Sequence, residues 1–276
     1  MSSFASVTCS SRFNSESAGT MQFDHDPTKI LIVGMSGAGK STYQIRYVKN
    51  TPYDRIFIFD HKLEFRAKLG VDTVFSTDDI VRKLEEGKEK MFSYSPLEDY
   101  PGDQQLGFNF YCEWTYNVCK ALCADGRKSL FVADEVNRFT DSSNMGDEFR
   151  ELIEDGRLQG LDFIGTSHGA NSINNKLRGQ LSEIVALRTR DARPLKFLEE
   201  NGFDPEEVRA LNKGEFISLD CANDRFTRSK LFSCPRTEKS VEPESETSTI
   251  PSRNTQHALS SAPADGLPDG VESGPQ

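Results

Sequence analysis

A glycine-rich stretch near the start of the sequence, GMSGAGKS at residues 34–41, has residue types that suit phosphate binding. It fits the pattern GxxxxGK[ST] without a mismatch, and the apolar run ILIV comes directly before it. Glycines let the backbone turn so that successive N–H groups point at phosphate oxygens, and a following helix adds partial positive charge at its N-terminus. The apolar run, the complete motif and a helical pattern together disfavour a chance glycine turn. The stretch therefore predicts a site for a nucleoside triphosphate.

Two side chains of this loop have chemical roles in the predicted site. Lys40 would reach the β- and γ-phosphates, and the Ser41 hydroxyl would coordinate Mg²⁺. The other positions would surround the phosphates mainly with backbone groups. The predicted nucleotide-binding residues are Gly34, Met35, Ser36, Gly37, Ala38, Gly39, Lys40, Ser41 and Thr42.

The segment SLFVADE, residues 129–135, places two acidic residues after a second apolar run. Asp134 at the end of a buried strand can hold the Mg²⁺ shell, and the adjacent Glu135 can position and activate the attacking water. An Asp-Glu pair after apolar residues is common by chance and gains meaning only beside a phosphate loop. With that loop present, we predict Ser41 and Asp134 as metal ligands and Glu135 and Lys40 as catalytic residues.

The segment DGRLQGLDFIGTSHG, residues 155–169, supplies further candidates around a third apolar run. If its strand lies beside the Asp134 strand, Ser167 or His168 at its end would face the γ-phosphate. Arg157 could reach across a subunit boundary and neutralise charge on the transferred phosphoryl group in trans, a role worth ~10³ or more in rate. The alternatives are an ordinary surface arginine at 157 and a hydrogen-bonded structural histidine at 168.

A third polar cluster, FDHKLEF at residues 59–65, follows another apolar run. Asp60, Lys62 and Glu64 are the charged members of this cluster. Because polar loops commonly follow strands, the sequence favours a polar strand-end loop over a functional role for these three residues.

Elements that would position these residues alternate along the middle of the chain. Apolar runs predict strands at Lys29–Val33, Arg55–Asp60, Met91–Tyr94, Ser129–Ala133, Leu161–Thr166, Ile184–Arg188, Glu215–Leu219 and Phe226–Phe232. Helical spacing predicts helices at Lys40–Val48, Thr77–Glu86, Gly107–Leu122, Asp147–Asp155, Ser172–Leu181 and Pro194–Asn201. Three strands are continuous apolar runs, which suits strands covered on both faces.

This alternation predicts an α/β fold with a mainly parallel central sheet flanked by helices. The strand Arg55–Asp60 lies between the phosphate loop and Asp134, which leaves room for a strand inserted between the two motif strands. That arrangement is typical of RecA-like P-loop NTPases of the additional-strand, catalytic-glutamate type. A GTPase would need an NKxD motif to read the base, and the sequence contains none.

Composition limits the class of protein further. The chain has 276 residues, enough for the core of one large or two small domains. Its formal net charge of −10 speaks weakly against nucleic-acid binding, but residues 28–232 carry 29 basic and 33 acidic residues. A local basic ring would not show in such a sum.

Both ends of the chain differ from its middle. Residues 1–27 are Ser-rich and aperiodic, which predicts a flexible arm. Residues 233–276 are acidic, contain six of the 12 prolines and no aromatic residue, and predict a disordered tail. The sequence has no signal-peptide pattern and no apolar run of about 18 residues. We therefore expect a soluble protein without a transmembrane segment, cytoplasmic or virion-associated and not secreted.

The order of these motifs resembles the HerA/FtsK superfamily of DNA-translocating ATPases over roughly residues 28–232. The matching stretches are the phosphate loop, DHKLE, FVADE, the Gly-Arg pair before the third motif strand, the polar end of that strand, ANSINNKLRGQLSEIVALRTRD, and a closing helix, Gly turn and strand in FDPEEVRALNKGEFISL. The superfamily usually has glutamine in a Thr-Gln pair where this sequence has Ser167. Serine reaches less far than glutamine, which weakens the expected sensor role of that position.

The resemblance implies an ATPase with Mg²⁺ that moves double-stranded DNA without regard to sequence, as a homo-oligomeric ring. The compact chain looks most like the genome-packaging ATPases of internal-membrane, double jelly-roll viruses, for which capsid or membrane-vertex proteins are further candidate partners. Six basic residues are candidates for pore or subunit contacts or for solvated charge, namely Lys176, Arg178, Arg188, Arg190, Arg193 and Lys196. Alternatives are an ATPase for virion assembly or protein remodelling similar to zonula occludens toxin, a non-cycling nucleotide-binding scaffold, and a small-molecule kinase.

Overall fold

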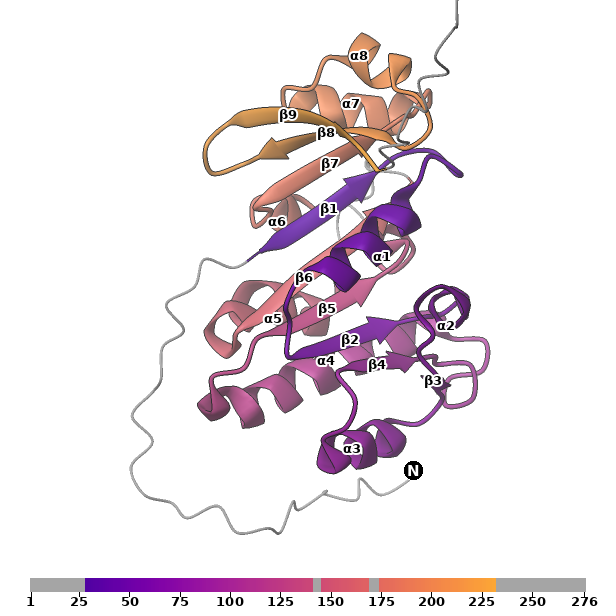
Figure 1. Cartoon of the computed structure of the whole chain (residues 1–276), viewed down its shortest axis with the longest axis vertical. Coiled ribbons are helices and arrows are strands. Elements are labelled where there is room, and N and C mark those ends of the chain that lie inside the picture. Colours follow the sequence, from indigo (N-terminus) through magenta and orange to yellow (C-terminus); the bar gives the residue numbers. More distant parts are fainter. Residues whose placement is uncertain (1–27, 141–144, 169–173, 232–276) are drawn as a thin grey trace, which may run out of the picture. The chain divides into compact units, whose positions relative to one another are not determined.

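The computed structural model describes residues 28–140, 145–168 and 174–231 of the chain. The described strands form one sheet in the order β3-β4-β2-β5-β6-β1-β7-β8-β9 (Figure 1). Strands β1 to β7 pair in parallel, and β8 and β9 extend the sheet by antiparallel pairing. The strands are β1 (Lys29–Val33), β2 (Arg55–Phe59), β3 (Thr73–Val74), β4 (Met91–Tyr94), β5 (Ser129–Ala133), β6 (Leu161–Ser167), β7 (Glu183–Leu187), β8 (Glu215–Asp220) and β9 (Arg225–Lys230).

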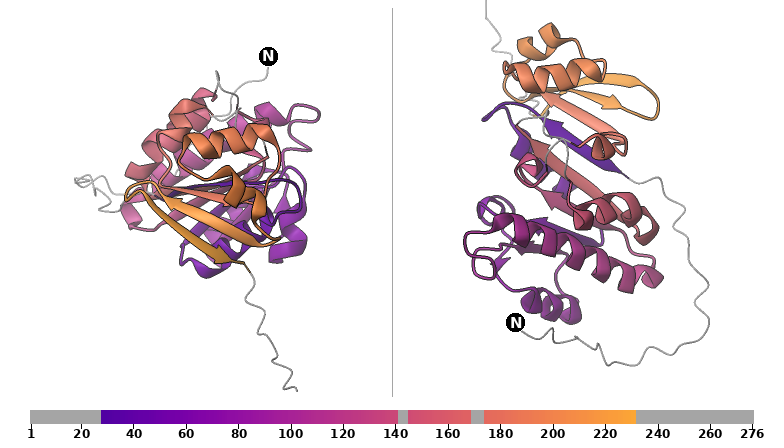
Figure 2. Two further views of the ribbon diagram at one scale, coloured as in Figure 1. Left: turned by 90° about the horizontal axis from the view of Figure 1, so that it is seen from above. Right: turned by 180° about the vertical axis from the view of Figure 1, so that it is seen from behind.

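Helices cover both faces of this sheet. The helix α1 (Lys40–Asn50) lies on the face seen in Figure 1, and α4 (Gln104–Leu122) and α5 (Asp147–Asp155) lie on the opposite face, seen in the right panel of Figure 2. The other helices are α2 (Glu64–Leu69), α3 (Thr77–Glu86), α6 (Asn175–Arg178), α7 (Ala192–Glu200) and α8 (Pro205–Ala210).

The core follows from the two-residue period of the central strands. In β1, Ile30 and Ile32 pack into a cluster with α1, whereas Leu31 and Val33 join a larger aromatic-rich cluster with α4 and α5. Because both sets of side chains are fully buried, β1 carries no polar face. This explains why the central strands read as continuous apolar runs in the sequence.

The predicted α/β fold with a mainly parallel sheet is confirmed, and most element bounds agree within a few residues. Helix α4 begins at Gln104 rather than Gly107, because the Asp103 side chain accepts the Leu106 N–H at 2.9 Å and caps the first turn. The periodic pattern missed three short elements, α2, β3 and α8, which are too brief for it, although the resemblance implied a closing helix at α8. Of the predicted helix Ser172–Leu181, the structure shows Asn175–Arg178, and residues 172–173 lie outside the described residues.

The inserted strand is a different one from that suggested by the sequence. Strand β6 lies between β1 and β5, which carry the two motifs, whereas β2 pairs with the far edge of β5. Chain order had suggested β2 because it falls between the motifs in sequence. Sheet order does not follow chain order here, since β1 takes both its partners from the second half of the described chain.

The predicted N-terminal arm (1–27) and C-terminal tail (233–276) lie outside the described residues. Among the helices that the structure describes, none combines the length and the apolar character needed to cross a membrane.

One glycine fixes the packing of α4 on the loop after β4. A Cβ at Gly107 would lie 2.3 Å from Pro96 Cβ and 3.3 Å from a ring carbon of Tyr100. Because Pro96 is rigid and buried, we expect Gly107→Ala to destabilise the protein by about 1–3 kcal/mol. This loss should exceed the gain of ~1 kcal/mol from the better helix former.

The measurement is urea unfolding, with Gly179→Ala as the matched control. A Cβ at Gly179 meets its nearest neighbour, Asn175 O, at an ordinary 3.5 Å, and the backbone there has right-handed helical angles. Equal midpoints for the Gly107 variant and wild type would show that the loop can move aside without loss.

Candidate functional site

The predicted site residues meet at the carboxyl edge of the parallel sheet. The phosphate loop follows β1, Asp134 and Glu135 follow β5, and His168 follows β6. These three strands are neighbours in the sheet, and β2 lies next to β5, so the loop after β2 reaches the same edge. Parallel strands thus bring together residues that are far apart in the sequence.

The phosphate loop has a backbone that requires its glycines. Gly37 and Gly39 have φ values of 73° and 116°, in the left-handed region that side chains rarely adopt. Gly34 lies so close to β7 that a Cβ would be 2.9 Å from Leu187 Cβ. The loop ends at Gly39, where α1 begins with Lys40.

Lys40 lies inside the loop with its side chain turned back over the backbone. Only 5% of the residue is exposed, and its Nζ donates to the carbonyl oxygens of Gly34 at 2.8 Å and Met35 at 3.1 Å. The same Nζ lies 2.9 Å from His168 Nδ1. Burial lowers the pKa of Lys40 to about 8, although the nearby Asp134 and Glu135 act against this shift. A buried ammonium group in this loop suits the binding of phosphate oxygens.

Asp134 is fixed by a hydroxyl at the end of the neighbouring strand. The Thr166 hydroxyl donates to Asp134 Oδ1, and the Glu135 N–H donates to Thr166 Oγ1 at 2.9 Å. Thr166 therefore connects the turn after β5 to the end of β6 through two hydrogen bonds. Gln44 of α1 strengthens the same region, because its buried amide donates to the carbonyls of Ala133 at 3.1 Å and Ile164 at 3.3 Å.

Glu135 is surrounded by basic side chains. Its Oε1 lies 2.5 Å from Lys62 Nζ and 3.0 Å from His168 Nε2, and its Oε2 lies 3.4 Å from Arg138 Nη1. Burial alone would raise the pKa of Glu135, but the hydrogen bond and charge of Lys62, followed by His168 and Arg138, outweigh it. The pKa of Glu135 is therefore lowered, and the carboxylate stays ionised at neutral pH. Its backbone has φ 50°, a left-handed conformation that a side chain adopts only when its surroundings fix it.

The FDHKLEF cluster divides into structural and site residues. Asp60 accepts the N–H groups of Glu64 at 2.8 Å and Phe65 at 2.9 Å, so it caps α2, and Glu64 pairs with Lys68 on the surface. For these two residues the loop interpretation agrees with their contacts. Lys62 differs, because it lies in the site against Glu135.

Three more residues near Glu135 were not predicted. His61 is buried with its Nε2 3.9 Å from Glu135 Oε2, and its ring packs on Phe59 and Phe139. Arg138 and Asn137 belong to the short turn that follows Glu135. Their positions depend on the backbone turn at Glu135, for which the sequence carries no recognised signal.

The two polar residues at the end of β6 have different neighbours. The buried Ser167 hydroxyl donates to Asn137 Oδ1 at 3.1 Å, and the His168 N–H donates to the same oxygen at 3.1 Å. The His168 ring, by contrast, contacts both Lys40 and Glu135. The side chain that meets the phosphate loop from β6 is thus His168.

Arg157 lies at the opposite edge of the sheet from the phosphate loop. It belongs to the turn Gly156–Gln159, which precedes β6, and it is exposed. Its charge contributes, after burial, to lowering the pKa of Lys29 at the amino end of β1. The structure therefore does not bring Arg157 to Lys40 and Glu135 of the same chain.

The residues at this edge fit a Mg²⁺–nucleotide. The loop offers a buried ammonium group and, in the first turn of α1, the partly exposed hydroxyls of Ser41 and Thr42. Asp134 is 7% exposed and lies close enough to Lys40 to influence its pKa. Hydroxyl and carboxylate oxygens are the ligand types that Mg²⁺ prefers.

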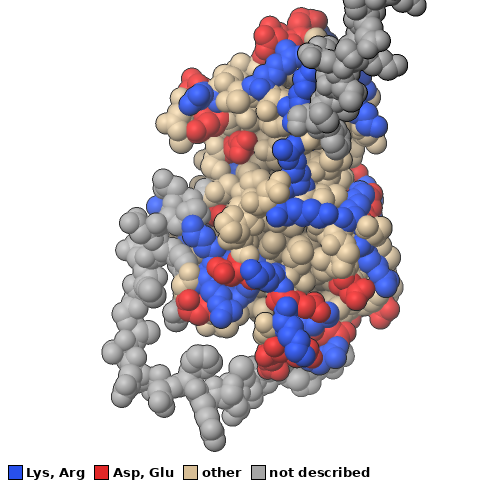
Figure 3. All heavy atoms as spheres, in the orientation of Figure 1, with Lys and Arg blue, Asp and Glu red and all other residues tan. Residues whose placement is uncertain are grey.

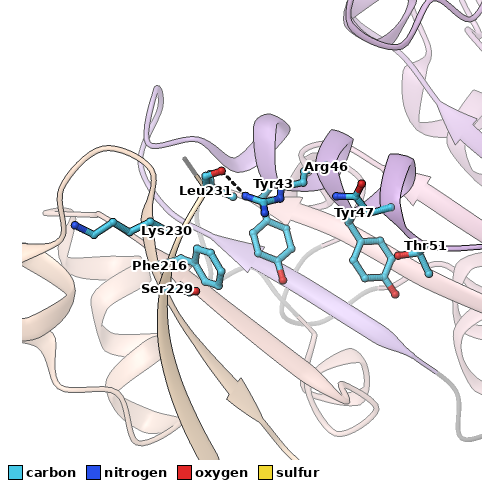
Figure 4. A pocket seen from close by; sticks show the side chains of 9 residues that line it. Tyr43, Arg46, Tyr47, Thr51, Phe216, Ser229, Lys230 and Leu231 are labelled. Atoms are coloured by element: carbon cyan, nitrogen blue, oxygen red, sulfur yellow. Dashed lines mark hydrogen bonds between the residues drawn. The ribbon is translucent and has the colours of Figure 1, made fainter. Parts of the chain in front are cut away.

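A groove of about 260 Å³ lies elsewhere, between α1 and the β8–β9 hairpin (Figure 4). Its lining includes Tyr43, Tyr47 and Phe216, and the rings of Tyr43 and Phe216 meet edge to face at 5.1 Å. The Tyr43 hydroxyl donates to Glu183 Oε1 at 3.5 Å, and Glu183 begins β7 at the amino edge of the sheet. Because no residue of the loop 34–41 lines the groove, we assign the phosphates to the loop and not to the groove.

Comparison with known proteins gives matches in structure but not in sequence. No family model and no curated protein sequence matches the chain. The genome packaging NTPase B204 from Sulfolobus turreted icosahedral virus 2, in complex with AMPPCP, is similar with a TM-score of 0.59 and 17% identity, over 74% of this chain and 97% of that chain. The DNA-packaging ATPase B204 from Sulfolobus turreted icosahedral virus gives a TM-score of 0.53 and 19% identity, over 75% and 98%.

A third similar structure is VirB4 of Thermoanaerobacter pseudethanolicus, with a TM-score of 0.54 and 12% identity, over 75% of this chain and 90% of that chain. These matches agree with the fold that the resemblance implied. The chain has the fold of the RecA-like P-loop ATPases, with a strand inserted between the two motif strands.

Proposed function

We propose that this protein is an ATPase that translocates double-stranded DNA, as a viral genome-packaging motor of the HerA/FtsK type. The observation that carries the proposal is the meeting of Lys40, Asp134 and Glu135 at one edge of the sheet, on the fold of a genome-packaging NTPase. The buried ammonium group of Lys40 and the ionised carboxylate of Glu135 lie on either side of the His168 ring, 2.9 Å and 3.0 Å from its two nitrogens. Backbone N–H groups of the glycine-rich loop would add donors for the phosphate oxygens.

Each residue has a defined part in the proposed reaction. Lys40 and the loop backbone bind the β- and γ-phosphates, and Ser41 and Asp134 would hold Mg²⁺. Bound Mg²⁺ supplies charge neutralisation for the phosphate oxygens. Glu135, ionised and held by Lys62, orients the attacking water and accepts its proton.

DNA binding is a separate part of the proposal. On the face seen in Figure 3, Lys and Arg are interspersed with Asp and Glu and do not form one continuous basic surface. Arg178 pairs with Glu200 at 2.8 Å and packs over the Phe197 ring, so we remove it from the candidate DNA contacts. The remaining candidates would meet DNA as a ring of like residues from several subunits, contacting backbone phosphates without reading bases.

The experiment that tests the function is steady-state ATP hydrolysis with and without double-stranded DNA across a salt series. We expect DNA to stimulate hydrolysis, and we expect the stimulation to fade as salt rises, because phosphate contacts release counterions. Hydrolysis that is indifferent to DNA would favour protein remodelling or virion assembly. Purified wild-type protein that forms rings yet neither binds nor hydrolyses ATP would contradict the proposal.

Arg157 is proposed to act on the nucleotide of the neighbouring subunit. Arg157 lies at the opposite edge of the sheet from its own phosphate loop, so it would act on a neighbouring subunit. We expect Arg157→Ala to lower the rate of hydrolysis ~10³-fold while nucleotide binding is retained. The check is to mix this variant with Lys40→Ala protein. Recovery of activity in mixed rings requires the two residues to act from different subunits, and normal turnover by Arg157→Ala alone would remove Arg157 from the site.

The lowered pKa of Lys40 predicts a pH dependence of ATP affinity. Lys40 is protonated below its pKa of about 8 and loses its positive charge as the pH rises through that value. We therefore expect the affinity of the free protein for a non-hydrolysable ATP analogue to fall above about pH 8. Fluorescence titrations between pH 6 and pH 10, with thermal unfolding at each pH to establish that the protein is folded, check this. An affinity that stays constant to pH 10 would contradict it.

A further inference from the structure

His168 stands between the phosphate loop and the acidic residue of the site. Its Nδ1 lies 2.9 Å from Lys40 Nζ, and its Nε2 lies 3.0 Å from Glu135 Oε1. Its backbone N–H donates to Asn137 Oδ1 at 3.1 Å, which fixes the turn that carries the ring. Both ring nitrogens are thus within hydrogen-bond distance of a charged side chain.

The chemistry of the two partners defines the state of the imidazole. An ammonium group only donates hydrogen bonds and an ionised carboxylate only accepts them. A neutral ring with its proton on Nε2 satisfies both, whereas a protonated ring would direct a donor at Lys40. The groups that face the ring are Lys40, Glu135, Asp134 and Lys62, and burial followed by Lys40 lowers the pKa of His168, which keeps the ring neutral.

The contact with His168 also completes the coordination of Lys40. An ammonium group has three N–H donors. Here the three acceptors are Gly34 O, Met35 O and His168 Nδ1, so a phosphate must replace at least one of them. His168 is the acceptor that comes from another strand, and it is the one that also holds Glu135.

We propose that His168 is a positioning residue that links nucleotide binding at Lys40 to the orientation of Glu135. Its Nδ1 competes with phosphate for Lys40, and its Nε2–H holds the Glu135 carboxylate in place for the attacking water. Lys62 also holds Glu135, but of the side chains in the described ranges His168 is the one with polar contacts to both charged groups, Lys40 and Glu135. This inference rests on the proposed ATPase function and names a coupling that the function alone does not require.

Two conservative variants separate the two contacts. Asparagine places an amide near the position of Nδ1, so His168→Asn keeps an acceptor for Lys40 but does not reach Glu135. Glutamine places an amide near the position of Nε2, so His168→Gln keeps a donor for Glu135 but loses the acceptor for Lys40. His168→Ala loses both contacts.

The experiment measures kcat for ATP and the Kd of a fluorescent non-hydrolysable ATP analogue for wild type and all three variants, with thermal unfolding as a check on folding. His168→Ala should bind the analogue roughly tenfold more tightly and turn over roughly tenfold more slowly. His168→Gln should bind more tightly with kcat near wild type, and His168→Asn should keep the wild-type Kd with a lowered kcat.

The possible failures are distinguishable. Wild-type turnover combined with unchanged Kd and kcat in His168→Ala overturns the coupling and leaves the ATPase function in place. Parallel losses of affinity and turnover in all three variants also overturn it, because they indicate a purely structural histidine. A wild-type protein that neither binds the analogue nor hydrolyses ATP overturns the function and this inference together.

Discussion

Glu135→Gln is expected to stop ATP hydrolysis and leave ATP binding intact. Glutamine has nearly the shape of glutamate, so the left-handed backbone at this position can be kept, and the amide oxygen can still accept from Lys62 and His168. It cannot accept a proton from water, because its amide is not a base at neutral pH. Loss of a general base typically costs ~10²–10⁴ in rate.

The measurement is single-turnover hydrolysis together with the Kd of a fluorescent ATP analogue. Glu113→Gln, which makes the same change at an exposed position on α4, is the matched control and should behave as wild type. Since hydrolysis is blocked, rings formed with ATP should persist in the Glu135 variant. Turnover within a few-fold of wild type would show that another group activates the water.

Lys40→Ala is expected to lose both ATP binding and turnover. The ammonium group is the buried cation of the phosphate loop, and no other lysine contacts Gly34 and Met35 among the described residues. Removing a charged donor of this kind costs ~10²–10³ in kcat, in addition to the lost ground-state binding. Equilibrium binding of the ATP analogue and steady-state hydrolysis measure the two losses separately.

Because Lys40 is buried, its removal also affects the free protein. The two carbonyls and the imidazole that now accept its protons lose a donor, so thermal unfolding must accompany the binding measurements. Lys49→Ala, at an exposed lysine in the last turn of the same helix, is the control for a lysine change in α1. A folded Lys40→Ala protein with wild-type affinity would remove the loop from the nucleotide site.

Features that depend on local sequence could be predicted. The strand, glycine turn and helix around Lys40 form one continuous segment, and within its turn Gly37 and Gly39 have left-handed φ. The buried strand before Asp134 has the same bounds in the prediction and the structure, because a strand covered on both faces tolerates only apolar residues.

Features that depend on strand order could not be predicted in the same way. Which strand separates β1 from β5 depends on packing across the whole sheet, and chain order suggested the wrong one. Lys62 is a site residue whose position depends on strand order in this way. Its loop resembles any polar loop after a strand, and only the pairing of β2 with β5 brings it 2.5 Å from Glu135. The pairing of β6 with β1 places His168, which follows β6, beside the phosphate loop.

The sheet order also determines when the nucleotide site can form during synthesis. Strands β2, β4 and β5 pair among themselves and can associate once residue 133 has been made. Among the described strands, β1, which carries the phosphate loop, pairs with β6 and β7, so its first partner is complete at residue 167 and its second at residue 187. Nucleotide therefore meets a complete site only after the chain has folded around it. Under the proposed function, ATP would stabilise the finished domain by slowing its unfolding and would not help the first steps of folding.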